Sequence, residues 1–386
     1  MRIVLLTDDL PPEAIGGSGR VVSETASELA ARGHNVTVIT GSDFPVWPHP
    51  SLGYAVRTVS KIPSRFAHYR SVFSFRRGQE ISAHLCDLKP DIVHAHGIAW
   101  NIGYRWIPFV KQHNMKVLYT AHGMMHVSYG KLAGDEKHVW WLDLRRARWT
   151  YNPFRNFIVK KYLSSLHALV SVSDALRVHL QKFGYPDMTV LHNGIDTDFW
   201  KPVDGRMEIR KQFDIPIDAP VFLLAGRLGW AKGLDLILDL WPTLHGQPHL
   251  ILAGTVPSGI AGRIDRVHLA GPQNREGMRT LYAACDVNLV PSLCFDCFPT
   301  TSLESMTSER LALMTNRGGG SEALKEGETG FVIDPRNSYA VRERMQWCID
   351  HPEDVRKIGK AAARHVRQNF TLTGHVDRLL QLYASL

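Results

Sequence analysis

The sequence contains 386 residues, of which 44% are hydrophobic and 21% are charged. A chain of this length is expected to form about two domains, and its composition excludes a disordered or fibrous protein. The formal net charge of +8 favours an anionic partner, such as phosphate groups, an anionic membrane surface or nucleic acid. Because paired zinc ligands and an aromatic RNA-binding box are missing, phosphate or membrane is the preferred interpretation.

Several sequence features predict a cytoplasmic protein. No apolar run approaches the roughly 20 residues that a membrane-spanning helix needs. Residues 3–7 run directly into Asp8 and Asp9, without the small-residue cleavage site of a signal peptide. The five cysteines are few and odd in number, as in a reducing compartment. Cys294 and Cys297 form one C-x-x-C motif, a candidate redox pair or half of a zinc site, but no second ligand pair accompanies it and we predict no metal.

The N-terminal half alternates strand and helix patterns. Strands are expected at residues 3–7, 36–39, 91–96, 117–121 and 167–171. After the first strand come Gly16 and Gly17, then a helix for which Ser18 is the expected N-cap and Gly33 the expected stop. A glycine-rich loop at a helix N-terminus suits phosphate binding, although a tight turn explains it equally well. The missing G-x-G-x-x-G motif argues against a dehydrogenase.

Two of these strands end in a His-Gly pair, at His96 and at His122. A histidine at the carboxyl end of a parallel strand faces the edge where ligands bind. The glycine that follows lets a ligand approach the backbone. A histidine with a purely structural role is the alternative for each of them.

Between residues 137 and 161, tryptophan, tyrosine and phenylalanine alternate with arginine and lysine. This mixture suits an interface with anionic lipid head groups. The alternative is a helix that packs its aromatic side chains inward and leaves its basic side chains in water. Pro153 interrupts any single long helix, so both interpretations stay open.

The second half repeats the alternation, which predicts a second parallel sheet covered on both faces. Strands are expected at residues 221–225, 250–253, 267–270, 287–290 and 311–314. We therefore predict two Rossmann-like domains, at residues 1–190 and 200–371, with a C-terminal helix at about 372–386 that packs back on the first. A ligand would bind between the two domains.

Charged residues lie where strands of the second domain end. Arg227 and Lys232 follow the first strand and are flanked by glycines, a pattern that suits a diphosphate, although two solvated surface cations would look the same. Asp296 and Glu304 lie across a later strand-to-helix turn. Glu304 is expected in the first turn of its helix, where the dipole stabilises a carboxylate, and such a carboxylate can also accept from a ribose diol. Free N–H groups around residues 299–302 would hold sugar hydroxyls or phosphate.

In their order and spacing, these motifs resemble the GT-B glycosyltransferases of the large retaining family 4. The similarity runs nearly from end to end. It comprises Gly16-Gly17, KPDIVHAHG, TAHG, VSVSD, LHNGIDTDFWKP, GRLGWAKG, CDVNLVPS, the spaced acidic pair, Gly318-Gly319, Glu322 and TGFV. The resemblance implies an α/β GT-B fold, with two Rossmann-like domains that face each other across a cleft.

The resemblance also implies roles for individual residues. Catalytic roles fall to His122, Arg227, Lys232 and Asp296, and donor binding to Gly16, Gly17, Arg227, Lys232, Phe298, Pro299, Thr300, Thr301 and Glu304. The two cations would hold the donor diphosphate, and Glu304 would bind the ribose as the second glutamate of an E-x7-E pattern. Asp296 stands in place of the first glutamate, near the donor sugar. The chain departs from the family here, because aspartate is one methylene shorter and Cys297-Phe298-Pro299 replaces Gly-Phe-Gly.

The expected function is a retaining, metal-independent transfer of a hexose-type sugar from a nucleotide-sugar. The acceptor would be a saccharide or a lipid-linked saccharide in surface polysaccharide or lipopolysaccharide assembly. No cofactor and no nucleic acid are expected, and peripheral contact with the inner face of the membrane would run through residues 137–161. The alternatives are a non-catalytic GT-B protein that binds nucleotide or glycan, and a nucleotide-sugar epimerase.

Overall fold

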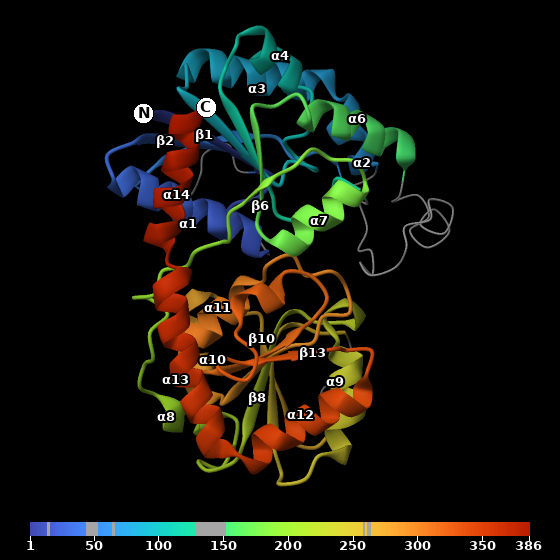
Figure 1. The fold of residues 1–386 in the computed structure, drawn as a ribbon, viewed down its shortest axis with the longest axis vertical. Helices are drawn as coiled ribbons and strands as arrows, with labels where there is room; N and C mark the ends of the chain where they lie inside the picture. Colours follow the sequence, from blue (N-terminus) through green and yellow to red (C-terminus); the bar gives the residue numbers. More distant parts are fainter. Residues whose placement is uncertain (14–15, 44–52, 64–65, 128–151, 258, 261–263) are drawn as a thin grey trace. The chain divides into compact units, whose positions relative to one another are not determined.

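The structure is a computed structural model that describes residues 1–13, 16–43, 53–63, 66–127, 152–257, 259–260 and 264–386 (Figure 1). The described chain forms two compact units. The first contains residues up to Gly194 together with Leu372–Leu386, and the second contains Ile195–Thr371. Each unit is built on one parallel sheet, so the predicted two-domain α/β class is confirmed.

The first unit has a seven-stranded sheet in the order β3-β2-β1-β4-β5-β6-β7. Its strands are β1 (Arg2–Thr7), β2 (Asn35–Gly41), β3 (Ala55–Val59), β4 (Ile92–His96), β5 (Val117–Ala121), β6 (Ala168–Ser171) and β7 (Thr189–Val190). Its described α-helices are α1 (Gly17–Ala31), α2 (Ala67–Phe73), α3 (Phe75–Leu88), α4 (Ile107–Gln112), α6 (Pro153–Leu163), α7 (Asp174–Lys182) and α14 (Leu372–Ser385).

The second unit has a six-stranded sheet in the order β10-β9-β8-β11-β12-β13. Its strands are β8 (Val221–Arg227), β9 (His249–Thr255), β10 (Val267–Gly271), β11 (Val287–Val290), β12 (Leu311–Thr315) and β13 (Phe331–Ile333). Its described helices are α8 (Arg206–Gln212), η2 (Trp230–Lys232), α9 (Leu234–Leu240), η3 (Trp241–Thr243), α10 (Arg275–Ala284), α11 (Thr300–Thr307), η4 (Gly320–Ala323), α12 (Ser338–Asp350) and α13 (Pro352–Asn369).

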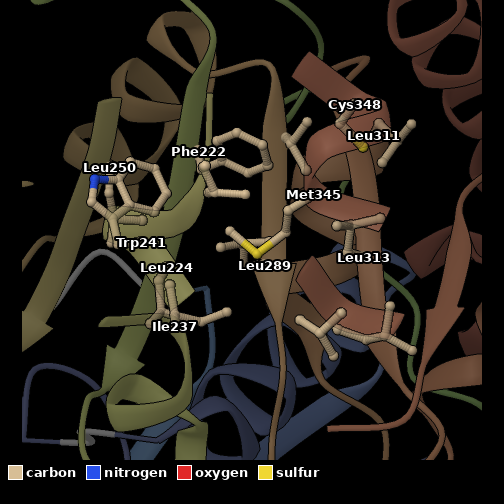
Figure 2. Close-up of a cluster of buried hydrophobic side chains, with 14 of the residues drawn as sticks. Phe222, Leu224, Ile237, Trp241, Leu250, Leu289, Leu311, Leu313, Met345 and Cys348 are labelled. Carbon is tan, nitrogen blue, oxygen red and sulfur yellow. The ribbon is translucent and has the colours of Figure 1, made fainter. Parts of the chain in front are cut away.

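The strands are continuous apolar runs because helices cover both faces of a doubly wound sheet. In the second unit, Phe222 of β8 packs edge to face against Trp241, with 5.8 Å between the ring centroids. Leu289 of β11 and Met345 of α12 extend the same buried cluster (Figure 2). This core fixes β8 and β11 side by side, and so determines where their carboxyl ends lie.

The strand order reverses once in each sheet, between β1 and β4 in the first and between β8 and β11 in the second. Ligands of open parallel sheets bind at the carboxyl ends of the strands at such a reversal. Arg227 ends β8, Lys232 follows it, and Asp296 and Glu304 follow β11. The topology therefore gathers the predicted donor residues at one edge of the second sheet.

Every strand expected in the two halves is present, and three others were missed. β3 is a partly buried edge strand, while β7 and β13 have two and three residues. Segments as short as β7 and β13 show no periodicity in the sequence, and they become strands by pairing with β6 and β12. The N-cap prediction for α1 was wrong, because α1 begins at Gly17 with Gly16 as its N-cap and Ser18 lies inside the first turn.

Helix α14 belongs to the first unit, although α13 directly before it belongs to the second. It packs against α1, and Val376, Leu379 and Tyr383 enter the core of the first sheet. At the surface, the Arg32 guanidinium of α1 lies 2.5 Å from the Asp377 carboxylate. Across the described residues, the structure has no helix whose length and apolarity would let it cross a membrane.

We predict that Arg210→Ala destabilises the second unit strongly. The Arg210 side chain is buried, pairs with Asp286 at 2.9 Å, and donates to the carbonyl oxygens of Pro216, Ala219 and Ala284. Its loss would leave buried acceptors without a donor, which costs about 3 kcal/mol or more. Urea unfolding would measure this loss of unfolding free energy.

The matched control is Arg206→Ala, since Arg206 also pairs with Asp286 but its side chain is 34% exposed. An exposed pair contributes about 1 kcal/mol or less. If both variants had the same unfolding free energy, the buried network would not be the reason for the stability of this unit.

Candidate functional site

The segment after β8 carries the two predicted diphosphate-binding cations. Arg227 is the exposed last residue of β8, and Lys232 ends the short helix η2. Gly233 follows with φ +74°, and a Cβ there would clash with the carbonyl oxygen of Pro291. Because only glycine satisfies both conditions, Gly233 lets the β8 and β11 segments touch.

Lys232 forms an ion pair with Asp296 across these two segments. The Ser292 hydroxyl also donates to the Asp296 carboxylate, at 2.9 Å. Burial lowers the pKa of Lys232, but the charge and hydrogen bond of Asp296 outweigh this effect and leave it above its usual value. Lys232 is therefore charged, and Asp296 serves as its counter-ion in this structure.

Backbone hydrogen bonds hold Asp296 in place. Its N–H donates to the carbonyl oxygen of Arg317 at 2.9 Å, and its own carbonyl oxygen accepts from Gly319 N–H at 2.9 Å. Gly318 between them has φ +110°, and a Cβ there would clash with the Asp296 backbone. The Arg317 Nε also donates to the Leu293 carbonyl oxygen at 2.7 Å. The segments after β11 and β12 are thus fastened together.

Glu304 is buried, with 1% of its surface exposed. The Tyr282 hydroxyl of α10 lies 3.1 Å from Glu304 Oε2 and 3.1 Å from the Thr301 carbonyl oxygen, and can donate to either. The expectation that Glu304 lies in the first turn was wrong. Helix α11 begins at Thr300, so Glu304 is its fifth residue and lies beyond the turn where the helix dipole acts most strongly.

The start of α11 carries the remaining predicted donor residues. Phe298 is buried and its ring centroid lies 5.8 Å from that of Phe370. Pro299 is the N-cap, and Thr300 and Thr301 are the half-buried first helical residues. Since Pro299 has no side-chain cap hydrogen bond to offer, the first N–H groups of α11 depend on other acceptors.

Gly16, Gly17 and His122 belong to the first unit. Gly16 caps α1 and Gly17 opens it. His122 follows β5, and its Nε2 lies 2.9 Å from Nδ1 of His96, which ends β4. Burial and the neighbouring histidines hold the pKa of His122 at about 3, so its imidazole is neutral at pH 7.

This histidine pair is part of a larger buried cluster. His94 lies 2.7 Å from the Tyr383 hydroxyl of α14 and 2.8 Å from the Thr120 hydroxyl. His375 of α14 contacts the carbonyl oxygen of His192 at 2.7 Å. The C-terminal helix therefore supports the strand ends that present His96 and His122.

Asp8 shows how the end of β1 is organised. Its carboxylate accepts from Trp100 N–H at 2.7 Å and from Ile102 N–H at 2.9 Å. Burial raises the pKa of Asp8 to about 8, against the lowering effect of these hydrogen bonds. Asp8 thus fastens the segment after β4 to the end of β1.

The structure brings Lys232 and Asp296 into contact and places Arg227 at the same sheet edge. The sequence analysis missed Ser292 and Arg317, which hold Asp296, and Tyr282, which contacts Glu304. Ser292 and Arg317 each follow a buried strand of this sheet, a position that could have identified them. No such signal exists for Tyr282, which reaches the site through helix packing.

Two further sequence features are the C-x-x-C motif and the aromatic and basic segment 137–161. Cys294 and Cys297 are buried and neither forms a disulfide. In the part of the chain that the structure describes, no three histidine, cysteine or acidic side chains converge as metal ligands. Of the segment 137–161, residues 137–151 lie outside the described residues, and residues 152–161 form the N-cap and most of α6.

Comparison with known proteins decides the family. The family model Glycosyltransferase Family 4 matches residues 15–199, and the model Glycosyl transferases group 1 matches residues 205–365. The protein belongs to the family 4-like GT-B glycosyltransferases. The two models together cover both units, so the resemblance and the enzyme class predicted from sequence are confirmed.

Curated relatives of this glycosyltransferase span nearly its whole length. It is 25% identical to glycogen synthase of Mycobacterium tuberculosis, over 99% of this chain and 94% of the relative. It is 26% identical to D-inositol 3-phosphate glycosyltransferase of Mycolicibacterium smegmatis (96% and 86%). It is 24% identical to D-rhamnosyltransferase WbpZ of Pseudomonas aeruginosa (96% and 92%).

Solved structures support the GT-B fold of the glycosyltransferase. Sucrose-phosphate synthase from Thermosynechococcus elongatus aligns with a TM-score of 0.81 and 20% identity, over 100% of this chain and 98% of that one. HepE of Anabaena in complex with UDP-glucose aligns with a TM-score of 0.76 and 17% identity, over 100% of both chains. At these identities the likeness establishes the fold alone.

We predict that Asp296→Asn destabilises the second unit by about 2 kcal/mol, because it leaves the Lys232 ammonium without its counter-ion in a largely buried place. Urea unfolding of the variant would measure this change. Asp218→Asn is the control, since Asp218 is exposed and its replacement should leave the unfolding free energy unchanged. Equal effects of the two substitutions would show that the ion pair contributes no stability.

We also predict that the protein loses stability between about pH 6.5 and pH 4. The pKa values of His122 and His375 are lowered to about 3 and about 4 in the folded chain. In this window the unfolded chain therefore binds more protons at these histidines, and unfolding is favoured as pH falls. Asp8, whose pKa is raised, opposes this trend. Because it is one group and the buried histidines are several, we expect the net stability to fall.

Urea unfolding at about pH 7.5 and about pH 5 would measure the effect. His122→Asn should reduce the difference between the two conditions, because one buried titrating group is removed. His351→Asn is the control at an exposed histidine. An unfolding free energy that is the same at both pH values would contradict the prediction.

Proposed function

We propose that this enzyme transfers a hexose-type sugar from a nucleotide-diphosphate sugar to a saccharide or lipid-linked saccharide in surface polysaccharide assembly. The transfer would retain the anomeric configuration and need no metal ion. The observation that carries the proposal is the pair of cations, Arg227 and Lys232, at the strand reversal of the second sheet. This is where an open parallel sheet binds its ligand.

The departing nucleotide diphosphate is the anion that such cations would stabilise. Arg227 is exposed and offers a bidentate fork for phosphate oxygens. Lys232 offers a compact charge, and its pairing with Asp296 raises its pKa above the usual value. Fixed positive groups that face the developing charge lower the barrier without reorganising. We therefore assign neutralisation of the leaving group to these two side chains.

Retention by front-face attack fits the state of Asp296. Its carboxylate is engaged by Lys232 and by the Ser292 hydroxyl, which makes it a poor candidate for a covalent nucleophile. In the proposed step, the acceptor oxygen bonds to the anomeric carbon on the face that the diphosphate leaves. The acceptor proton passes to an oxygen of the departing diphosphate. His122, neutral at pH 7, would contact the reacting sugar.

The named relatives support the substrate classes of this proposal. HepE of Anabaena was solved with UDP-glucose, a nucleotide-hexose. Glycogen synthase and D-rhamnosyltransferase WbpZ are named for a polysaccharide product and for a transferred sugar. One of these names thus contains a nucleotide-sugar, one a polysaccharide product and one a transferred sugar, and each class fits the proposed reaction.

We predict that the protein releases nucleotide diphosphate from one member of a panel of UDP-, GDP- and ADP-sugars when a saccharide acceptor is present. Lys232→Met should lower kcat by about 10²- to 10³-fold, as expected for the loss of one group that stabilises developing charge. Lys357→Met is the control, because Lys357 is an exposed lysine of α13. The absence of release with every donor, combined with no thermal shift by any nucleotide, would refute the proposal.

A second candidate is a GT-B protein that binds nucleotide or glycan without turnover. The ion pair between Lys232 and Asp296 favours it, because both side chains are engaged with each other. Thermal stabilisation by a nucleotide without any release of diphosphate would select this candidate. Glu304→Gln should then weaken nucleotide binding, with no activity to lose.

A further inference from the structure

Four of the exposed phenylalanines of the first unit lie on three neighbouring helices. Phe73 ends α2 and is 45% exposed, while Phe75 opens α3 and is 67% exposed. Phe154 and Phe157 of α6 are 64% and 62% exposed. Exposed apolar side chains that gather in one place mark an interaction site. We refer to these four residues as the phenylalanine face.

Direct contacts join the elements of this face. Helix α2 packs against α6 (Figure 1), and the rings of Phe73 and Phe154 stack with 6.5 Å between their centroids. The Asn152 side chain, which caps α6, donates to the Tyr69 hydroxyl of α2 at 2.7 Å. Phe73 and Phe154 are therefore two parts of one surface.

Arg105 connects the third element to the same surface. Its guanidinium lies 3.8 Å from the ring centroid of Phe75 and donates to the Tyr162 hydroxyl of α6 at 2.8 Å. On α6, Phe154, Phe157 and the exposed Lys161 follow one another at spacings of three and four residues, which places them on one side of the helix. The aromatic surface is thus bordered by positive charge.

A cavity of about 460 Å³ adjoins the face and is lined by Phe73 together with several cations. Two of these cations, Lys61 and Arg77, are paired with carboxylates. Arg70 and Arg76 are exposed, and in the described chain no carboxylate pairs with either of them. Glu80, which also lines the cavity, pairs with Arg77. Within the described chain, the cavity therefore presents the guanidinium groups of Arg70 and Arg76 without a paired carboxylate, beside the ring of Phe73.

We propose that the phenylalanine face docks on an anionic phospholipid bilayer, with a lipid phosphate held by Arg70 and Arg76 in the adjoining cavity. Phenylalanine side chains enter the boundary between head groups and acyl chains, and each nearby arginine adds attraction to anionic lipid. The guanidinium groups bind phosphate oxygens bidentately. A second copy of this chain is the poorer occupant, since a symmetric interface would place two positively charged faces together.

Phe154, Phe157 and Lys161 belong to the segment 137–161, for which the sequence predicts membrane contact, whereas Phe73, Phe75, Arg70 and Arg76 lie outside it. The inference does not depend on the proposed transfer reaction. No donor or acceptor takes part in the docking. Binding to vesicles can therefore be measured without nucleotide, and it succeeds or fails independently of nucleotide diphosphate release.

The test is co-sedimentation of the full chain with vesicles of phosphatidylcholine alone or of phosphatidylcholine with phosphatidylglycerol. The wild-type protein should bind the anionic vesicles at least about tenfold more tightly than the neutral ones. Arg70→Glu with Arg76→Glu should remove this preference, and Phe154→Ser with Phe157→Ser should weaken binding to both vesicles by about tenfold or more. Tyr339→Ser, at a 70% exposed aromatic residue of the second unit, should bind like the wild type.

Thermal unfolding would confirm that each variant is folded, and the charge variant tests the proposal even if the phenylalanine variant is not. Wild-type protein that fails to bind anionic vesicles would overturn the proposal. The same conclusion would follow if the arginine variant bound them unchanged. A dimer in solution that Phe154→Ser with Phe157→Ser dissociates, without vesicle binding, would assign the face to a second copy instead.

Discussion

The site proposed for the donor in the second unit of this glycosyltransferase depends on the contact between the segments that follow β8 and β11. The order of the parallel sheet places the two strand ends side by side, and Gly233 allows the backbones to touch at the Pro291 carbonyl. Lys232 and Asp296 then pair across the contact. The lysine is partly buried, and the charge and hydrogen bond of Asp296 raise its pKa above the usual value. The position of the charge that we propose for a diphosphate therefore follows from the sheet topology and from one ion pair.

The contacts of Asp296 explain why an aspartate fits at the position where the family has a glutamate. Asp296 is held by backbone hydrogen bonds to the segment after β12, and its carboxylate is shared between Lys232 and Ser292. A short side chain suits a carboxylate that must stay close to its own loop. Its role in this structure is to position and charge the lysine, which leaves Arg227 as the exposed cation of the pair.

The first unit differs from the second because it buries several histidines, and burial lowers their pKa so that they stay neutral. His94 and His96 are two residues apart in β4 and so lie on the same face of the strand, with ring centroids 3.8 Å apart. Tyr383 of α14 contacts His94. Burial keeps these imidazoles neutral, which is the form that can both donate and accept a hydrogen bond. The same unit carries its exposed aromatic and basic side chains on α2, α3 and α6. The buried histidines of this unit therefore lie at the strand ends and on α14, whereas the exposed phenylalanines lie on α2, α3 and α6.

The amino-acid sequence alone determined the two-domain α/β class, the principal strands and the family, because continuous apolar runs and ordered motifs are local signals. It also indicated Arg227, Lys232, Asp296 and Glu304 as candidates for the site. Only the tertiary structure showed that Lys232 pairs with Asp296, that the Tyr282 hydroxyl lies within hydrogen-bonding distance of Glu304, and that Phe73 stacks on Phe154. These contacts join residues far apart in the chain, and no periodicity or spacing encodes them. They follow from the order of the strands and the packing of the helices, which exist only once the chain has folded.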